Sequence, residues 1–337
     1  MSLRRYSEYK DSGVVWLGNL PSHWVCKRVK QNTYLKGRVG WKGLTSDEYL
    51  EDGFAYLVTG TDFSQKVISW ANCHCVAEER YEDDTFIHLR NGDLLITKDG
   101  TIGKLALVAN LDKPACLNSG IFLVRPESDY QTEFMYWVLS SKSFATFCDL
   151  SSLGSTIQHL YQNVFENFSF PIPSLLEQTA IATFLDRETE KIDGLIAEQE
   201  KLIALLAEKR QATISHAVTK GLNPDAPMKD SGVTWLGEVP AHWGETRLKY
   251  ATKLIVDCPH ETPIYDDAGG YKVIRTADVT EGKLESCGMY SVTESEYLNR
   301  IRRQALAKND IVYGREGERW GFAALVPKDE QYLSVRV

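Results

Sequence analysis

The amino-acid sequence predicts an α+β protein: a globular domain of mixed sheet with helices, a long coiled-coil helix, and a second, incomplete copy of the domain. A fifteen-residue motif occurs twice, and short apolar segments joined by glycine-containing turns follow each copy in the same order. A long amphipathic segment separates the two series. We place the domains at residues 1–172, 173–223 and 224–337.

The repeated motif is KDSGVVWLGNLPSHW from Lys10 and KDSGVTWLGEVPAHW from Lys229, with eleven of fifteen positions identical. A long motif that occurs twice indicates a duplicated domain rather than a solenoid. Residues shared by both copies should build the common scaffold, whereas residues that recognise different targets should differ. We therefore expect the repeated tryptophans to pack in the cores: Trp16, Trp24, Trp235 and Trp243.

Two further segments repeat as strand-and-turn units. Residues 53–63 align with 269–279 as a short apolar strand followed by a polar turn. Residues 91–108 align with 308–326, with one residue inserted, as a strand, a glycine-containing hairpin and a second strand. The frame is kept, but the tips TKDGTIGK and GREGERWG differ. This pattern is typical of a scaffold that presents variable recognition loops.

The segment between the copies is expected to be one long helix. Ser174 and Glu177 form a capping box, and Gly221 with Pro224 ends the helical pattern. A helix over about 174–220 would be about 70 Å long at ~1.5 Å per residue. Because such a helix is stabilised by packing, it needs a partner helix. The stripe that would face this partner consists of Ile181, Leu185, Ile192, Leu195, Leu202 and Leu206.

The charge distribution is uneven. The net charge of −8 would usually argue against a nucleic-acid partner, yet an average hides local fields. Residues 12–46 contain no acid, and aromatic side chains are interleaved with the basic ones. The stretch is either a solvated basic loop or a set of phosphate contacts. Its basic residues are Lys27, Arg28, Lys30, Lys36, Arg38 and Lys42.

The sequence lacks the motifs of cofactor-dependent catalysis. There is no phosphate-binding loop, and Cys73–Cys75 has no second Cys/His pair at zinc spacing, so we expect no metal. Glu281 and Lys283 resemble part of a metal-dependent nuclease site, but the first copy carries Gln65 and Val67 at the aligned positions. We therefore reject a catalytic site there.

The predicted location is the cytoplasm. No apolar run approaches the ~20 residues that span a bilayer, and the N-terminus lacks the apolar region of a secretory signal. The seven scattered cysteines fit reduced thiols better than a disulfide framework.

These motifs together resemble those of a known family. The family is the DNA-specificity (S) subunit of type I restriction-modification systems. The resemblance rests on KDSGVxWLGxxPxHW, present twice, on GSTIQHL at 154–160, and on the long-helix sequence that begins PIPSLLEQTAIATFLDRETEKIDGL. VDCPHETPIY at 256–265 resembles an opening found in many recognition domains of this family. The match covers nearly the whole chain.

The resemblance implies a non-catalytic subunit that reads double-stranded DNA. Each recognition domain would read one half of a bipartite target, and paired long helices would set the spacing and dock two methyltransferase subunits. Those partners would carry S-adenosylmethionine and methylate adenine, which must leave the base stack. A restriction subunit would add an ATP-driven translocase and nuclease. The expected cofactors, S-adenosylmethionine, ATP and Mg²⁺, would therefore sit on partner subunits.

One expectation concerns what the chain lacks. The family's second long helix and the last part of the second domain have no counterpart here, so we expect about a hundred residues to be missing by comparison with the first copy. A naturally shortened subunit could restore symmetry as a homodimer through the long helix.

Candidate DNA contacts come from the acid-free stretch, the hairpin tips and copy-specific polar residues. Arginine or lysine at a tip can bind guanine in the major groove, whereas solvated turns and helix caps are the alternatives. The candidates are Lys27, Arg28, Lys30, Lys36, Arg38, Lys42, Lys98, Thr101, Lys104, Ser155, Thr156, His260, Thr262, Arg315 and Arg319.

A second function class remains open on the residues alone. The chain could be a coiled-coil scaffold that links two protein-binding domains without touching DNA. The overall negative charge favours this interpretation, whereas the acid-free stretch and the divergent hairpin tips favour DNA recognition.

Overall fold

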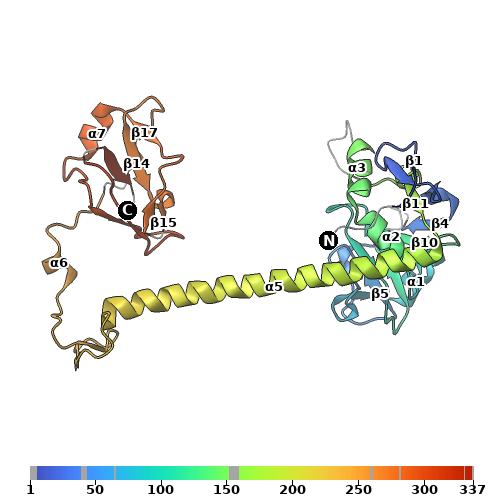
Figure 1. Ribbon diagram of the computed structural model, residues 1–337, viewed down its shortest axis with the longest axis horizontal. Coiled ribbons are helices and arrows are strands. Elements are labelled where there is room, and N and C mark those ends of the chain that lie inside the picture. The colour runs from blue at the N-terminus through green and yellow to red at the C-terminus, as the bar shows by residue number, and fades with distance from the viewer. Residues whose placement is uncertain are drawn as a thin grey trace. The chain divides into compact units, whose positions relative to one another are not determined.

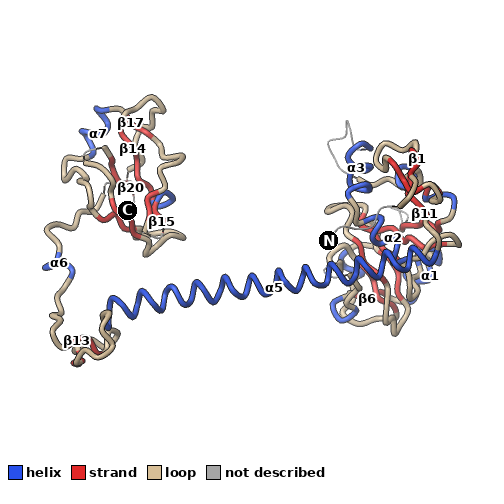
Figure 2. The backbone as a smooth tube through the Cα atoms, viewed as in Figure 1, coloured by secondary structure: helices blue, strands red, loops and turns tan. Residues whose placement is uncertain are grey.

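The protein folds as two units that both contain helices and strands. The units are Met1–Glu208 and Lys209–Val337, so the division falls within the long helix, whereas the predicted boundaries lie at its two ends. The predicted α+β class and long helix are confirmed (Figure 2). No helix in the described part of the chain is long and apolar enough to cross a membrane. The computed structural model describes residues 6–38, 44–63, 66–151, 159–258, 261–280, 282–329 and 331–335.

The long helix α5 (Leu175–Lys220) begins and ends as its sequence predicts. Ser174 Oγ donates to Glu177 Oε2 at 2.8 Å, and the Glu177 amide donates to Ser174 Oγ at 3.4 Å. These bonds satisfy groups that a helix start leaves open. Gly221 follows the last turn with φ of 77°, a conformation that ends helices because glycine has no Cβ to clash.

The first unit contains two main sheets (Figure 1). One has the strand order β4-β10-β7-β8 with antiparallel neighbours throughout, and the other has the order β6-β5-β9 with β5 parallel to β9. Smaller pairs join β1 to β2 and β3 to β11. The strands are β1 (Tyr9–Asp11), β2 (Asn19–Pro21), β3 (Val25–Arg28), β4 (Thr33–Gly37), β5 (Ala55–Val58), β6 (His74–Val76), β7 (Leu94–Thr97), β8 (Leu105–Leu107), β9 (Ala115–Leu117), β10 (Ile121–Pro126) and β11 (Ser169–Ile172).

The four-stranded sheet is buried on both faces. Ile96 and Phe122 pack into one core with the helices, whereas Leu95 and Leu123 pack into a second core with β5 and β9. Burial on both sides explains why β7 and β10 are almost continuously apolar instead of alternating. The helices of this unit before α5 are α1 (Glu78–Glu82), α2 (Thr132–Leu139), α3 (Lys142–Ser151) and α4 (Gln162–Phe165).

The repeated motif adopts the same local structure in both copies. β1 pairs with β2 as β12 (Met228–Asp230) pairs with β13 (Glu238–Pro240). The Ser12 amide donates to the Gly18 carbonyl, and the Ser231 amide donates to the Gly237 carbonyl, each at 3.0 Å. These bonds lie within the motif, so they join groups that are close in sequence.

The second unit repeats the arrangement of the first unit's strands. β14 lies between an antiparallel β17 and a parallel β20, as β5 lies between β6 and β9. The hairpin β18–β19 corresponds to β7–β8, and the amides of Val108 and Val326 donate to the carbonyls of Asp93 and Asp310 at 2.8 and 2.9 Å. Its remaining elements are α6 (Leu248–Ala251), β14 (Tyr271–Arg275), β15 (Val279–Thr280), β16 (Lys283–Leu284), β17 (Ser291–Val292), α7 (Glu294–Arg300), β18 (Ile311–Tyr313), β19 (Ala323–Leu325) and β20 (Tyr332–Val335).

One prediction about the tryptophans is wrong. Trp16 packs against Phe147 and Phe168, but its repeat partner Trp235 is 84% exposed. The two phenylalanines come from α3 and from the residue before β11, so the burial of Trp16 depends on tertiary packing and not on the repeated motif itself.

Candidate nucleic-acid interface

The strand order gathers several predicted contacts at one end of the four-stranded sheet. Phe122 faces Gly37 in β4, and Ile121 faces Thr97 in β7, so the end of β4, the start of β10 and the end of β7 lie together. We call this region the hairpin end; it comprises Lys36–Arg38, the turn 98–104 and the turn 118–120.

The β7–β8 turn is held in one shape by Thr97. Its hydroxyl donates to the Thr101 carbonyl at 2.6 Å and accepts from the Lys104 amide at 3.0 Å. Gly100 and Gly103 have φ of 67° and 85°, which side-chain-bearing residues rarely adopt. The turn therefore presents Thr101 and Lys104 to solvent from a fixed backbone.

Two other lysines at the hairpin end lie against aromatic rings. Lys98 Nζ is 4.8 Å from the centroid of Phe122, and burial lowers the pKa of Lys98. Lys36 Nζ is 5.9 Å from the centroids of both Tyr34 and Phe86. Their ammonium groups are thus positioned over rings, so Lys104 is the freer charge of this region.

The assignment of Arg38 as a phosphate contact is corrected by its burial. Arg38 is 1% exposed, and its Nε donates to the Leu117 carbonyl at 2.8 Å. Its Nη2 lies 3.5 Å from Cys116 Sγ, and burial raises the pKa of that thiol to about 11. A guanidinium enclosed in this way supports the core behind the hairpin end and does not reach solvent.

The other described basic residues of the acid-free stretch lie at the opposite end of the sheet. Lys27 is paired with Asp129, which follows the end of β10. Lys30 Nζ donates to Asn167 Oδ1 at 3.0 Å, and Arg28 is exposed beside it. Because β3 pairs with β11 and β4 pairs with β10, a stretch that is continuous in sequence divides into two separate surfaces. Four further predicted contacts lie outside the described residues: Lys42, Ser155, Thr156 and His260.

The predicted contacts of the second unit lie on and near its own hairpin. Arg315 forms an ion pair with Asp257 at 3.2 Å, and Arg319 Nη1 donates to the Val279 carbonyl at 3.2 Å. Thr262 is exposed, and its carbonyl accepts from Arg300. Both arginines at the tip are therefore partly engaged within the unit.

Three side chains that lie at or beside the hairpin end are not among the contacts predicted from the sequence. His159 pairs with Asp99 of the turn, and the ring of Tyr161 lies 4.4 Å from that of His159 with 56% of Tyr161 exposed. The Leu160 amide donates to the Lys98 carbonyl at 3.0 Å, which attaches this segment to the turn. His159 and Tyr161 directly follow the polar GSTIQ segment in the sequence, and this position was the one signal that could have indicated them.

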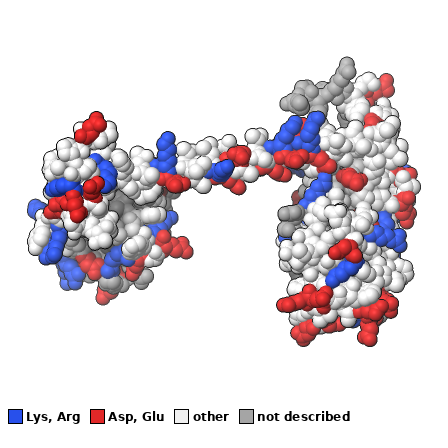
Figure 3. All heavy atoms as spheres, turned by 90° about the horizontal axis from the view of Figure 1, so that it is seen from below, with Lys and Arg blue, Asp and Glu red and all other residues white. Residues whose placement is uncertain are grey.

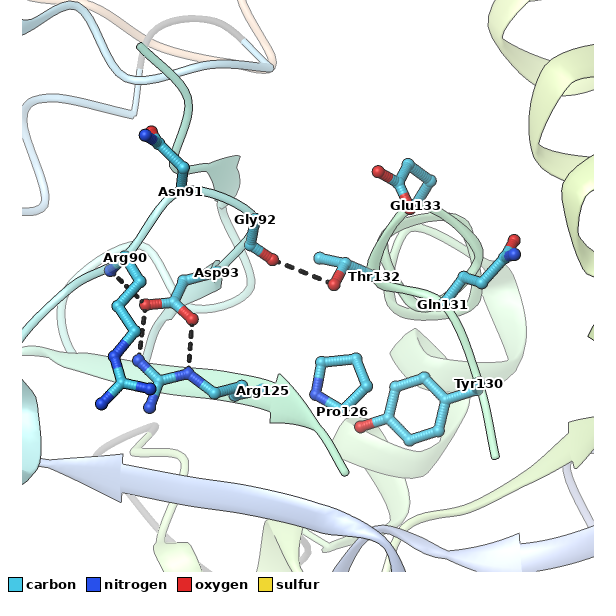
Figure 4. A pocket seen from close by; sticks show the side chains of 10 residues that line it. All are labelled: Arg90, Asn91, Gly92, Asp93, Arg125, Pro126, Tyr130, Gln131, Thr132 and Glu133. Carbon is cyan, nitrogen blue, oxygen red and sulfur yellow. Dashed lines mark hydrogen bonds and ion pairs between the residues drawn. The ribbon is translucent and has the colours of Figure 1, made fainter. Parts of the chain in front are cut away.

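A shallow pocket of about 420 Å³ lies at the other end of β7 and β10 (Figure 4). Asp93 is 2% exposed and accepts from Arg125 at 2.7 and 2.8 Å. The hydrogen bond to Asp93 raises the pKa of Arg125. Thr132 Oγ1 donates to the Gly92 carbonyl at 3.0 Å and ties α2 to the same turn. This arrangement holds the start of β7 in place.

Charges are mixed over both units. On the face drawn in Figure 3, lysine and arginine side chains alternate with acidic ones along α5 and are scattered over each unit. In the described part of the chain, no group of three or more His, Cys, Asp or Glu side chains is placed to hold a metal ion.

The predicted apolar stripe of α5 divides into a packed part and an exposed part. Ile181 packs against the core of the first unit, and Leu185 is partly buried. The other four positions are about half exposed: Ile192 (54%), Leu195 (64%), Leu202 (46%) and Leu206 (54%). Isolated in water, such a row is an unfavourable surface for a helix.

Comparison with known proteins gives a consistent assignment. Residues 44–204 match the family described as Type I restriction modification DNA specificity domain. The chain is therefore similar to the type I specificity subunits. The EcoBI specificity subunit of Escherichia coli is 26% identical over 227 residues, covering 65% of this chain and 47% of that protein. The MjaVIII specificity subunit of Methanocaldococcus jannaschii is 24% identical over 298 residues, covering 87% and 64%.

A solved structure of the HsdS subunit from Thermoanaerobacter tengcongensis aligns with a TM-score of 0.45 and 19% identity, over 64% of this chain and 48% of that chain. The chain spans 47% and 64% of the length of the two curated relatives named above. Specificity subunits of this family are generally non-catalytic.

Proposed function

We propose that this chain recognises DNA sequence within a type I restriction-modification complex, with each unit reading one half of a bipartite target. One observation carries the proposal. The aligned hairpins β7–β8 and β18–β19 keep the same supporting hydrogen bonds but present different tips. A constant frame with a variable tip suits two readers of different half-sites. The family match favours this role over a protein-binding scaffold.

The hairpin end of the first unit is the proposed contact surface. Thr101 and Lys104 project from a turn fixed by Thr97, and Tyr161 is exposed beside them. A rigid turn loses little conformational entropy on binding, which favours precise placement of a lysine against a phosphate or guanine. The side chain of Asp99, an acid within this turn, is paired with His159.

Titration of the assembled complex with target DNA over a salt series tests this surface. We expect Lys104→Ala to weaken binding and to reduce the slope of log affinity against log salt by about one phosphate contact. Lys30→Ala, which removes an exposed lysine at the opposite end of the sheet, is the matched control and should leave the slope unchanged. An equal loss of DNA affinity in both variants would contradict the proposal that the hairpin end is the surface that contacts DNA.

We further propose that this chain binds no cofactor and carries no catalytic step. S-adenosylmethionine, ATP and Mg²⁺ belong in this proposal to methyltransferase and restriction subunits. The exposed row Ile192, Leu195, Leu202 and Leu206 would pack on a partner helix, from another copy of the chain or from another subunit.

Substitution in this row tests the docking role. Leu202→Asp should abolish co-purification with the methyltransferase subunit, because it places an unpaired charge in the packed seam. Ala204→Asp places the same charge on the opposite side of the helix and should leave assembly intact. If Leu202→Asp still co-purified with the methyltransferase subunit, the docking proposal would be wrong.

A further inference from the structure

The first unit holds α5 by a contact that lies beyond the helix cap. Trp137 Nε1 of α2 donates to Asp186 Oδ1 at 2.9 Å, and Lys66 forms an ion pair with the same oxygen. Lys66 Nζ lies 5.0 and 5.2 Å from the ring centroids of Tyr136 and Trp137. One helix carboxylate is thereby fixed from two directions, and Figure 1 shows α2 beside the start of α5.

Lys66 also connects this contact to the strand that carries the hairpin. The Leu107 amide donates to the Lys66 carbonyl at 2.7 Å, and the Ile68 amide donates to the Leu107 carbonyl at 3.2 Å. Leu107 ends β8, and the first residue of β8 follows the turn 98–104. A short path therefore runs from the proposed reading turn along the backbone of β8, through the hydrogen bond to Lys66, to the ion pair with Asp186.

Asp186 lies close to the point where α5 leaves the first unit. Nearer the cap, the fully buried Gln178 accepts from the Gln131 amide at 2.9 Å and donates to two carbonyls. Residues 191–216 are all exposed. These two polar anchors lie eight residues apart, on either side of the packed Ile181, and together with that packing they fix the direction of the helix.

Small errors in that direction grow along the helix. Glu208 lies about 33 Å beyond Asp186 at ~1.5 Å per residue, so a tilt of about 6° displaces the helix axis there by about 3.5 Å. Adjacent base pairs in DNA are about 3.4 Å apart. A tilt of this size therefore corresponds to about one base pair of spacing.

We propose that Lys66, Trp137 and Asp186 form a positioning contact that fixes the angle at which α5 leaves the first unit, and so restricts the half-site spacing that the complex accepts. This proposal rests on the DNA-recognition role proposed above. As a partly exposed ion pair, Lys66–Asp186 contributes little to folding stability, so its effect should appear in geometry rather than in unfolding.

The first test measures helix direction without DNA. Nitroxides on ketone-bearing residues at Thr85 and Glu198 of the full chain avoid the seven native cysteines, and pulsed dipolar spectroscopy gives the distance distribution. We expect one narrow distribution for the parent chain, a clearly broader one for Asp186→Ala and for Lys66→Met, and a narrow one for Lys66→Arg. Glu190→Ala, an exposed position one turn later, is the control. An unchanged distribution in Asp186→Ala overturns the positioning role.

The second test measures spacing in the assembled complex. After the methylated target is identified by methylome sequencing, duplexes with the natural spacer and with one base pair more or less are compared. We expect Asp186→Ala to reduce discrimination between these spacers about fivefold, within the range for mutations in coupling networks. Affinity for a duplex carrying only the first half-site should not change.

The two tests separate the proposals. If no variant and no parent complex binds any duplex, the proposed function fails, and the distance distributions still decide whether the contact positions α5. If the distribution broadens while spacer discrimination is unchanged, the link from this contact to DNA spacing is overturned.

Discussion

The first and second units begin with nearly the same fifteen residues and fold them alike, yet they bury them differently. Trp16 stacks on Phe168, meets Phe147 edge-on, and donates its indole N–H to the Ser169 carbonyl at 2.9 Å. Trp235 is 84% exposed. The comparison shows that the motif encodes its own turns, whereas burial of its tryptophan depends on residues about 150 positions away.

The hairpins show the same difference. β7 is hydrogen-bonded on both sides, to β8 and β10, and its four residues are buried. β18 pairs with β19 alone among the described strands, and Ile311 and Leu325 on these strands are 70% and 56% exposed. Local pairing forms in both hairpins, but among the described strands only the first unit's hairpin belongs to a larger sheet.

The sharpest test of this comparison is truncation of the two tryptophans. Trp16→Ala should destabilise the first unit by about 3 kcal/mol, because it removes aromatic packing and an indole hydrogen bond. Trp235→Ala should change stability by less than about 0.5 kcal/mol, as for other exposed positions. Hydrogen exchange with mass spectrometry on the full chain reports β10 and β14 separately. If Trp235→Ala destabilised β14 as much as Trp16→Ala destabilises β10, the two tryptophans would not differ in the way proposed.

A smaller effect is expected at the contact between α5 and the first unit. Gln178→Ala leaves the Gln131 amide without its acceptor and two carbonyls without their donor, so we expect a loss of about 2 kcal/mol. Gln199→Ala, at an exposed position on the same helix, should be neutral or slightly stabilising because alanine favours helix. Denaturant unfolding of both variants measures the difference.

The smallest effect should be a pH dependence confined to the first unit. Glu177 accepts from the side chains of His23, Ser174 and Trp24, and the hydrogen bond from His23 is the main cause that lowers the pKa of Glu177 from 4.5 to about 2. Because the folded pKa is depressed, this stability is present above about pH 4.5 and is lost as pH falls towards 2.

Glu177→Gln should therefore reduce the loss of first-unit stability as the pH falls from about 4.5 towards 2. The stability of the second unit should not change. Hydrogen exchange of β10 and β14 across this pH range, corrected for intrinsic rates, gives the measurement. If the stability of the first unit still fell as steeply with pH in the variant, other carboxylates would be the cause of the pH dependence.

The hairpin frames and the limits of the helix could be predicted from sequence because their determinants are local. Ser174, Glu177 and Gly221 lie within a few residues of the groups they bind or release. The composition of the candidate surface could not be predicted in the same way. Lys27 and Lys36 belong to one acid-free stretch, but β3 and β4 pair with different strands and place them at opposite ends of the sheet.

Arg38 illustrates the same limit for a single side chain. Its sequence neighbourhood indicates a solvated cation, yet it lies 1% exposed against Cys116 and Leu117, which are nearly eighty residues away. The Lys66–Asp186 contact is equally invisible in sequence, because 120 residues separate its partners.

The sequence by itself determined the duplication, the strand-and-turn frames and the long capped helix, since repeats, turn residues and periodicity act over distances of a few residues. The tertiary structure alone decided which lysines share a surface, which tryptophan is covered and where α5 is anchored. Those outcomes depend on strand pairing and packing between distant segments, and the free energy of such contacts depends on neighbours that no local pattern specifies.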